Sequence, residues 1–218
     1  MLGNDLVFSS NKKNRSEARV QRALEKILSA PEFQSLAISD LHEKMSIAWS
    51  IKEACFKYCR RFERILFYPK SFVIQQMISN EYEGEIAFLE KDLERKGFAN
   101  IPHKTAIIKT PKEQLICKSI ATTNYIHSIV CNDLKKFDDI YWGVSQIRSS
   151  KYIDQSTAVR NKARTHLLKA TKRQIHTPCH FKKDERKIPI AYVDGVEYNV
   201  AFSFSHDHHF IAYAWCPL

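Results

Sequence analysis

Three short stretches of the chain carry side chains that could bind a metal ion and phosphate groups together. A carboxylate, Asp5, lies within residues 3–7 (GNDLV), and a second carboxylate with two lysines lies within residues 49–57 (WSIKEACFK). A serine and a histidine lie near the end, within residues 204–207 (FSHD). Mg²⁺ takes oxygen ligands such as carboxylates, and lysine attracts phosphate as a point charge. These stretches are candidates for one site, provided that the fold brings them together.

The middle stretch is expected on a helix that begins near Asp40 and runs past Arg60. Asp40 is a good N-cap residue, with Glu43 three positions later. At about 3.6 residues per turn, a set of apolar side chains falls on one stripe, which we expect to face the core. These residues are Ile47, Ile51, Ala54, Cys55, Tyr58, Phe62 and Ile65.

The opposite face of this helix has two interpretations. Trp49, Glu53 and Lys57 fall one turn apart on it, with Lys52 and Phe56 beside them. The first interpretation is a solvated Glu53–Lys57 pair, worth about 0.2–0.5 kcal/mol, next to an exposed aromatic ring. The second is the wall of a site, with a carboxylate for a hard cation and an ammonium group for phosphate. The helix by itself favours the first interpretation.

Composition limits the class of protein. The chain has 218 residues, of which 44% are hydrophobic, so it can form one large domain or two half-size units with an ordered core. A formal net charge of +10 favours an anionic partner, although solubility alone could account for it. The six cysteines form no C-x-x-C pair, and neither a secretory segment nor a membrane-spanning run is evident. We therefore expect a cytoplasmic protein with reduced thiols and no membrane partner.

The hydrophobic pattern predicts two groups of elements, each with a helix before its last strands. In the first group we expect helices at 16–30, ended by Pro31, and at 40–60, with strands at 3–8, 71–77, 85–88, 105–109, 114–121 and 125–131. In the second group we expect a helix at 154–175, with strands at 140–147, 188–193, 198–205 and 210–216. Hairpin turns are predicted at Gly84 and at Asp194-Gly195, and residues 176–187 form a polar loop without an assignment.

These two groups predict two domains, at residues 1–132 and 133–218, that act as one functional unit. Residues 125–131 and 210–216 share a pattern of an aromatic residue, isoleucine, an apolar pair and cysteine. The expected fold is therefore α+β, a pseudo-dimer of two similar lobes in which a helix packs on a small antiparallel sheet.

In combination and in this order, the three stretches resemble the 4'-phosphopantetheinyl transferase superfamily. That family is marked by a G-x-D-[IL]-[VE] strand, a W-x-x-K-E-A-x-x-K helix and an S-H-[SD] strand end. The chain has Gly3-x-Asp5-Leu6-Val7, Trp49-x-x-Lys52-Glu53-Ala54-x-x-Lys57 and Ser205-His206-Asp207. The helix motif is the most specific of the three.

The order of the lobes differs from the two-lobed, surfactin-synthetase-activating type of the family. An R-x-x-x-R helix, a G-K-P turn and the S-H strand mark one lobe of that type, and the matching residues come second here, as a circular permutation would give. The motif order also matches the small holo-acyl-carrier-protein synthases, but the chain is longer than a single copy of that unit. Two departures stand out: Lys187-Ile188-Pro189 replaces G-K-P, where Lys187 or Arg186 could supply the phosphate contact, and Val7 replaces a second acidic residue.

The resemblance implies a holo-acyl-carrier-protein synthase type of enzyme. It would transfer 4'-phosphopantetheine from coenzyme A to a serine of an apo acyl or peptidyl carrier protein, with Mg²⁺, releasing 3',5'-ADP. The residues that the resemblance implies for catalysis are Asp5, Glu53 and Lys57, of which Asp5 and Glu53 would hold the metal and Glu53 is the candidate base. The residues that it implies for binding coenzyme A are Arg160, Arg164, Lys187, Ser205 and His206. Carrier proteins of this class are acidic, which suits the basic chain.

Other readings of these residues stay open. Asp5 could cap the loop beside its strand, and His206 could belong to a surface cluster with His208 and His209. Arg160 and Arg164 could form a solvated helix face. The alternative function is an inactive module of the same fold that binds coenzyme A or a carrier protein. RNA binding, suggested by charge alone, lacks a supporting motif, so we expect no nucleic-acid partner. Two lobes in one chain predict a monomer.

Overall fold

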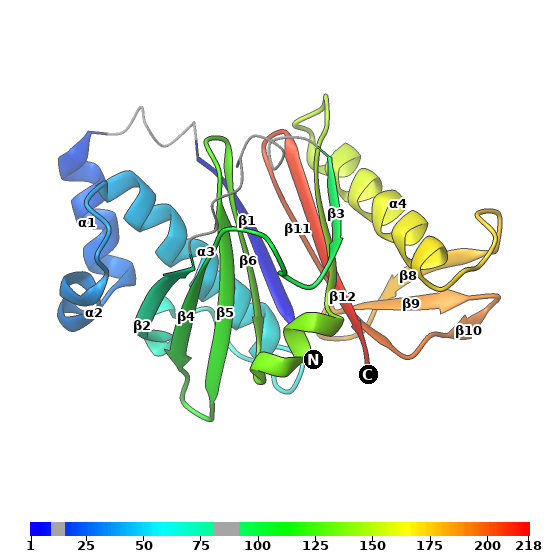
Figure 1. Ribbon diagram of the computed structural model, residues 1–218, viewed down its shortest axis with the longest axis horizontal. Coiled ribbons are helices and arrows are strands. Elements are labelled where there is room, and N and C mark those ends of the chain that lie inside the picture. The colour runs from blue at the N-terminus through cyan, green and yellow to red at the C-terminus, as the bar shows by residue number, and fades with distance from the viewer. Residues whose placement is uncertain (10–15, 81–91) are drawn as a thin grey trace.

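Two antiparallel sheets lie side by side in the computed structural model, which describes residues 1–9, 16–80 and 92–218 (Figure 1). The first sheet has the order β1-β6-β5-β4-β2, with β1 (Gly3–Phe8), β6 (Tyr125–Cys131), β5 (Gln114–Ala121), β4 (His103–Lys109) and β2 (Val73–Asn80). The second has the order β11-β12-β7-β3, with β11 (Val200–Asp207), β12 (Phe210–Pro217), β7 (Tyr141–Gln146) and β3 (Leu93–Lys96). A small third sheet joins β10 (Val196–Glu197), β9 (Pro189–Val193) and β8 (Cys179–Lys183).

Helices cover the outer sides of this pair of sheets (Figure 1). On the side of the first sheet are α1 (Glu17–Ile27), α2 (Ala30–Ser35) and α3 (Leu41–Cys59), of which α3 packs against β1 and β6. On the side of the second sheet, α4 (Tyr152–Ala170) packs against β11 and β12. Short 3₁₀ helices occupy Pro69–Ser71 and Leu134–Asp139. The prediction of an α+β fold with antiparallel sheets is confirmed, and the likeness of the two halves stays a prediction.

The local signals at α3 are found as expected. Asp40 is its N-cap, and its carboxylate accepts a hydrogen bond from the Glu43 backbone N–H at 2.9 Å. The expected stripe packs into the core of the first sheet as far as Tyr58. The helix ends at Cys59, however, so Phe62 lies beyond it and is 53% exposed. The stripe therefore ends with the helix, because helical spacing orients side chains only while the helix lasts.

The ends of two helices were predicted wrongly. The helix expected at 154–175 ends at Ala170. The helix expected at 16–30 ends at Ile27, and Pro31 lies in the first turn of α2. Proline has no backbone N–H to donate, which costs nothing in the first turn, where such groups have no helical partner. Ser29 and Glu32 form a capping box at this start, so the polar residues around Pro31 begin a second helix.

The strands also differ from the predicted pattern. The turn at Asp194-Gly195 is present, with positive φ at both residues, but it joins β9 to the short β10, whereas β11 pairs with β12. The 176–187 segment, left without an assignment, contains β8. The strand β3 was not expected and pairs with β7. The predicted strand at 85–88 and its turn at Gly84 lie outside the described residues.

Gly3 brings β1 unusually close to α3. A Cβ atom at Gly3 would lie 2.1 Å from the Ala54 carbonyl oxygen and 2.7 Å from the Tyr58 backbone nitrogen. The Ser50 hydroxyl also donates to the Asp5 carbonyl oxygen at 3.3 Å. Glycine is needed wherever backbone atoms of two elements approach this closely. The contact places the strand of Asp5 directly against the helix of Glu53 and Lys57.

The two sheets meet where β1 and β11 run parallel to each other. β1 pairs with β6 on one edge, and its other edge faces β11 (Figure 1). Side chains of β11, and not its backbone, accept the free N–H groups of that edge. The pairs are Asn4 N–H to Ser203 Oγ at 3.0 Å, Leu6 N–H to Ser205 Oγ at 3.0 Å and Phe8 N–H to Asp207 Oδ2 at 2.8 Å. We call this contact the seam; it satisfies an edge that would otherwise be open.

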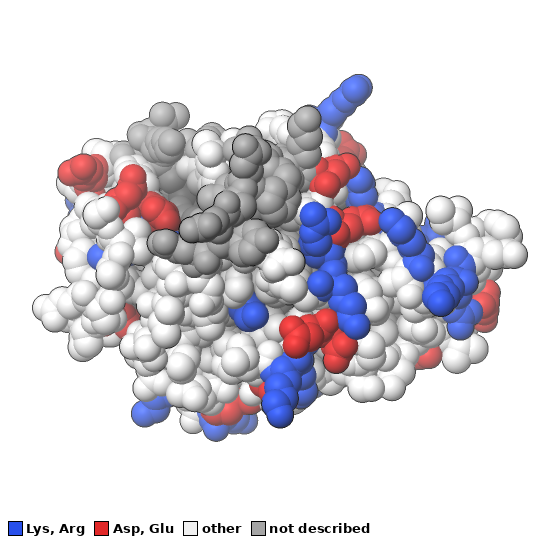
Figure 2. All heavy atoms as spheres, viewed as in Figure 1, with Lys and Arg blue, Asp and Glu red and all other residues white. Residues whose placement is uncertain are grey.

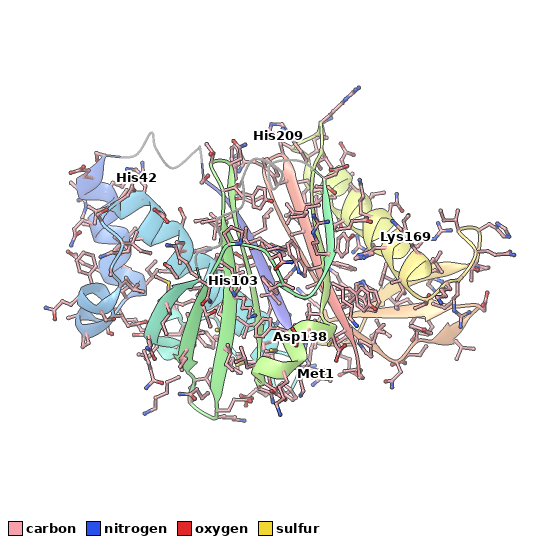
Figure 3. The ribbon with its side chains drawn as sticks, in the orientation of Figure 1. Met1, His42, His103, Asp138, Lys169 and His209 are labelled. Carbon is pink, nitrogen blue, oxygen red and sulfur yellow. The ribbon has the colours of Figure 1, made fainter. Side chains whose placement is uncertain are left out.

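The cysteines, the helix lengths and the ends of the molecule complete the description of the fold. All six cysteines are free thiols. None of the helices in the described part of the chain has the length and apolar character of a membrane span. Met1 and Asp138 lie at one end of the molecule, and His209, in the turn between β11 and β12, lies at the other (Figure 3).

Candidate active site

A cavity of about 1080 Å³ opens beside the seam. It is lined by residues of β1, α1, α3, α4 and β11 and of the segment 183–189 between β8 and β9. Most of the residues singled out from the sequence line it, although they come from both ends of the chain. These are Asp5, Glu53, Lys57, Arg160, Lys187, Ser205 and His206.

A buried carboxylate and an ammonium group form the centre of this cavity. Lys57 Nζ lies 2.8 Å from Asp5 Oδ1 and 3.7 Å from Glu53 Oε1. Burial raises the pKa of Asp5 to about 6, against the opposing effect of the Lys57 charge, and the nearby Glu53 charge raises it further. The pKa of Lys57 is raised, because the two carboxylates outweigh the effect of its burial. The three groups therefore form one coupled cluster on β1 and α3.

The second oxygen of the Asp5 carboxylate is the candidate ligand for a cation. Its Oδ2 atom is buried and has no hydrogen-bond partner among the described residues. A buried carboxylate oxygen without a partner is costly, and a hard cation would satisfy it. Together with Glu53 it fits Mg²⁺, which is commonly held by one or two carboxylates, with the other positions filled by water and phosphate oxygens. The described residues contain no group of three or more His, Cys, Asp or Glu side chains arranged to hold a metal ion.

The two lysines of the helix motif have different surroundings. We expected Lys52 beside Glu53 and Lys57 on the outer face, and this is wrong: its side chain is fully buried. Lys52 Nζ lies 2.6 Å from Glu32 Oε1 and donates to the carbonyl oxygens of Phe72, at 2.6 Å, and Pro69, at 3.1 Å. Lys52 therefore links α3 to α2 and to the 3₁₀ segment that precedes β2, and it lies outside the cavity.

The indole on the charged face of α3 is also accounted for. Trp49 is half-buried, lines the cavity and packs edge-on against Phe67, with ring centroids 5.4 Å apart. Phe56 contacts the same Phe67 ring at 5.1 Å. Trp49 therefore forms part of the cavity wall and holds the segment that follows the helix.

The cavity is strongly basic, although it also contains carboxylates. The cations that line it are Lys26, Lys57, Arg60, Arg61, Arg160, Lys183, Arg186 and Lys187, and the carboxylates are Asp5, Glu53 and Asp207. Lys26, Arg60, Arg61 and Lys183 were missed from the sequence. Lys183 ends β8 and pairs with Pro189, so its position depends on a strand that the sequence pattern did not reveal. Such an excess of cations favours a ligand with several negative charges.

The segment between β8 and β9 keeps the shape of a glycine turn without the glycine. Lys187 has φ of 62°, in the left-handed region that glycine prefers, and it stands where the G-K-P motif has glycine. Asp184 holds the turn by accepting hydrogen bonds from the backbone N–H groups of Arg186, at 2.9 Å, and Ile188, at 2.8 Å. Ile188 lines the cavity where that motif has lysine. The cations of this segment that line the cavity, and could therefore contact a phosphate group, are Lys183, Arg186 and Lys187.

His206 lines the cavity as a neutral side chain. Burial lowers the pKa of His206, and the positive charge of Lys57 lowers it further. Its ring packs edge-on against that of Tyr152, with centroids 5.0 Å apart. A neutral imidazole can donate a hydrogen bond from one nitrogen and accept one at the other, which suits contact with phosphate or ribose oxygens.

The two arginines of α4 point to different places. Arg160 lines the cavity and donates to the Ser156 carbonyl oxygen at 2.8 Å. Arg164 is not among the described residues that line the cavity, and it donates to the Ile175 carbonyl oxygen at 3.1 Å. Of the residues expected to bind coenzyme A, Arg164 is the one that the fold does not bring to the others.

Comparison with known proteins addresses the first half of the chain. The model of a family described as ACPS, the 4'-phosphopantetheinyl transferase superfamily, matches residues 1–106. This region contains β1 and α3, and with them Asp5, Glu53 and Lys57, whereas Ser205 and His206 lie beyond it. No curated protein matches the chain. Over residues 1–106, slightly less than half of the chain, this protein therefore resembles the 4'-phosphopantetheinyl transferase superfamily, as its motifs predicted.

Proposed function

We propose that this protein transfers 4'-phosphopantetheine from coenzyme A to a serine of an apo acyl or peptidyl carrier protein. The main support is the cavity: it gathers Asp5, Glu53 and Lys57 from the matched region with Arg160 and His206 from the second half. Coenzyme A carries a pyrophosphate and a 3'-phosphate, and the cations of the cavity outnumber its carboxylates. Phosphoryl transfer depends mainly on positioning and charge neutralisation, which such a site can provide.

Asp5 and Glu53 would hold the Mg²⁺ ion of this reaction. Asp5 Oδ2 has no hydrogen-bond partner in the described part of the chain, and Glu53 is close enough to raise the pKa of Asp5. When bound, the ion neutralises charge on the phosphate oxygens and orients them. Val7, which follows Asp5 on the same face of β1, adds no further oxygen ligand, so the protein supplies few ligands and leaves room for phosphate oxygens and water.

The transfer itself is a displacement at phosphorus. The serine hydroxyl of the carrier protein forms a new O–P bond to the phosphate attached to pantetheine, and the P–O bond to 3',5'-ADP breaks. The serine proton goes to Glu53, whose side chain is 31% exposed and lies on the cavity wall. Lys57 attracts the pyrophosphate as a point charge; its ammonium group donates to Asp5 and Ser205 and forms a longer ion pair with Glu53, at 3.7 Å.

Three other cations of the cavity would bind the remaining phosphate groups of coenzyme A. Arg160 would offer a forked guanidinium to a phosphate group, and Lys183 and Lys187 line the cavity near Ile188 in the same segment. His206 would donate a hydrogen bond to a phosphate or ribose oxygen. The proposed partner is an acidic carrier protein. On the face shown in Figure 2, Lys and Arg side chains gather over α4 and β3, with Asp and Glu among them.

Mass spectrometry of an apo carrier protein incubated with coenzyme A and Mg²⁺ tests this function directly. The carrier should gain the mass of phosphopantetheine, and Glu53→Gln should abolish that gain. Glu43→Gln is the matched control, because Glu43 lies on the same helix and outside the cavity. No gain with any of several acidic carrier proteins would contradict the proposal. Tight binding of coenzyme A without transfer would favour the alternative of an inactive binding module, which the isoleucine at position 188 makes worth testing.

A further inference from the structure

The hydroxyl group of Ser205 has no hydrogen-bonding capacity left for a ligand. A serine hydroxyl can donate one hydrogen bond and accept two. Ser205 Oγ accepts from the Leu6 backbone N–H at 3.0 Å and from Lys57 Nζ at 3.3 Å, and it donates to Asp5 Oδ1 at 2.9 Å. Ser205 is only 5% exposed. A phosphate oxygen could contact this hydroxyl only if one of the three bonds were broken.

These bonds fix the orientation of the Asp5 carboxylate. Asp5 Oδ1 accepts from both Lys57 and Ser205, whereas Oδ2 has no partner among the described residues. A carboxylate is planar, so holding one oxygen from two directions also determines where the other oxygen lies. One of the two donors comes from α3 and the other from β11, across the seam. The position of Oδ2 therefore depends on a residue that lies outside the region matched by the family model.

We propose that Ser205 is a positioning residue, which holds Asp5 from across the seam and presents Oδ2 to the cation site, and that it is not a contact to coenzyme A. This revises the role that the family resemblance implied for Ser205. The inference rests on the proposed function only in taking Asp5 as a cation ligand. Residues that orient metal ligands typically change metal affinity or activity by about 10-fold to 100-fold when they are removed.

The seam provides a matched control two residues away on the same strand. Ser203 is 4% exposed, and its hydroxyl accepts from the Asn4 backbone N–H at 3.0 Å, just as Ser205 accepts from Leu6. Among the hydrogen bonds of the described residues, however, Ser203 reaches neither Asp5 nor Lys57. Ser203→Ala and Ser205→Ala therefore each remove one β11 acceptor for an N–H group of β1, and only the second also removes one of the two donors to Asp5 Oδ1.

The test compares these two variants and Ser205→Thr, which keeps the hydroxyl, by two measurements. The first is Mn²⁺ binding by electron paramagnetic resonance, with coenzyme A at a fixed concentration and a protein-free blank. The second is the steady-state kinetics of transfer. For Ser205→Ala we expect Mn²⁺ binding and kcat to weaken by about 10-fold to 100-fold, with the KM for coenzyme A changed less than about twofold. Ser203→Ala should keep both values near those of the wild type, and Ser205→Thr should recover most of the loss.

Two results would overturn the inference while leaving the proposed function intact. One is a raised KM for coenzyme A with unchanged Mn²⁺ binding and kcat in Ser205→Ala, which would make Ser205 a ligand contact. The other is an equal loss in Ser203→Ala, which would mean that the seam has only a structural role. A wild-type protein that transfers nothing but binds Mn²⁺ refutes the proposed function alone, and the binding comparison then decides on Ser205. A wild-type protein that does neither overturns both.

Discussion

Replacing the buried lysine of the helix motif, Lys52→Met, should lower the free energy of unfolding without changing the transfer activity. All three N–H groups of the ammonium are used, by Glu32 and by the carbonyl oxygens of Phe72 and Pro69. Burial alone would raise the pKa of Glu32, but bonds from Lys52, Ser29 and Ile74 hold it below its ordinary value, so the carboxylate stays charged. The variant therefore leaves a buried anion and two carbonyl groups without their partner.

The expected size of the effect follows from this geometry. Removing one partner of a buried ion pair costs about 3–5 kcal/mol. For a chain of this length, each kcal/mol lowers Tm by roughly 2–4 °C, which predicts a decrease of about 6–20 °C. Urea unfolding followed by circular dichroism measures the free energy of unfolding. The double variant Lys52→Met with Glu32→Gln should recover about 1–3 kcal/mol, because the remaining side chain is no longer charged.

The control for this prediction is the transfer rate, measured at a temperature where the variant is folded. Lys52 does not line the cavity, so kcat and the KM for coenzyme A should stay near the wild-type values. A variant that kept its stability within about 1 kcal/mol and lost transfer would refute the reasoning. Lys52 would then act on a ligand.

Three further predictions concern other parts of the structure. Gly3→Ala should lower the free energy of unfolding, measured in urea, by about 1–3 kcal/mol and should reduce transfer, because the new Cβ would displace α3 at Ala54. A urea midpoint equal to that of the wild type would show that the close contact is not needed. Complete burial lowers the pKa of His127 from 6.5 to about 3, so the unfolded chain binds a proton that the folded protein does not, and stability should fall as the pH drops through this range. His127→Gln should flatten that dependence in unfolding titrations, and an unchanged slope would exclude His127 as its source. Arg160→Ala should raise the KM for coenzyme A by about 10-fold, while Arg164→Ala, one turn away and outside the cavity, should leave it unchanged; equal effects would contradict the placement of the two arginines.

The sequence was sufficient wherever the deciding interactions are local. The N-cap at Asp40, the apolar stripe of α3 as far as Tyr58 and the turn at Asp194-Gly195 depend on residues a few positions apart. Helical spacing also placed Glu53 and Lys57 on one face, which made them candidates for a common site. The helix motif itself, with Asp5 upstream of it, was specific enough to indicate the family that the match over residues 1–106 supports.

Only the tertiary structure decided how each side chain is used. Lys52 and Lys57 belong to one motif, but α2 and the 3₁₀ segment before β2 cover the first, while the second faces a cavity. Arg160 and Arg164 are one turn apart, and contact with Ile175 separates their roles. The bonds of Ser205 join residues about 150 and 200 positions apart in the sequence. Periodicity describes which side chains share a face, but what packs against that face depends on distant segments, whose positions are set by the folded core as a whole.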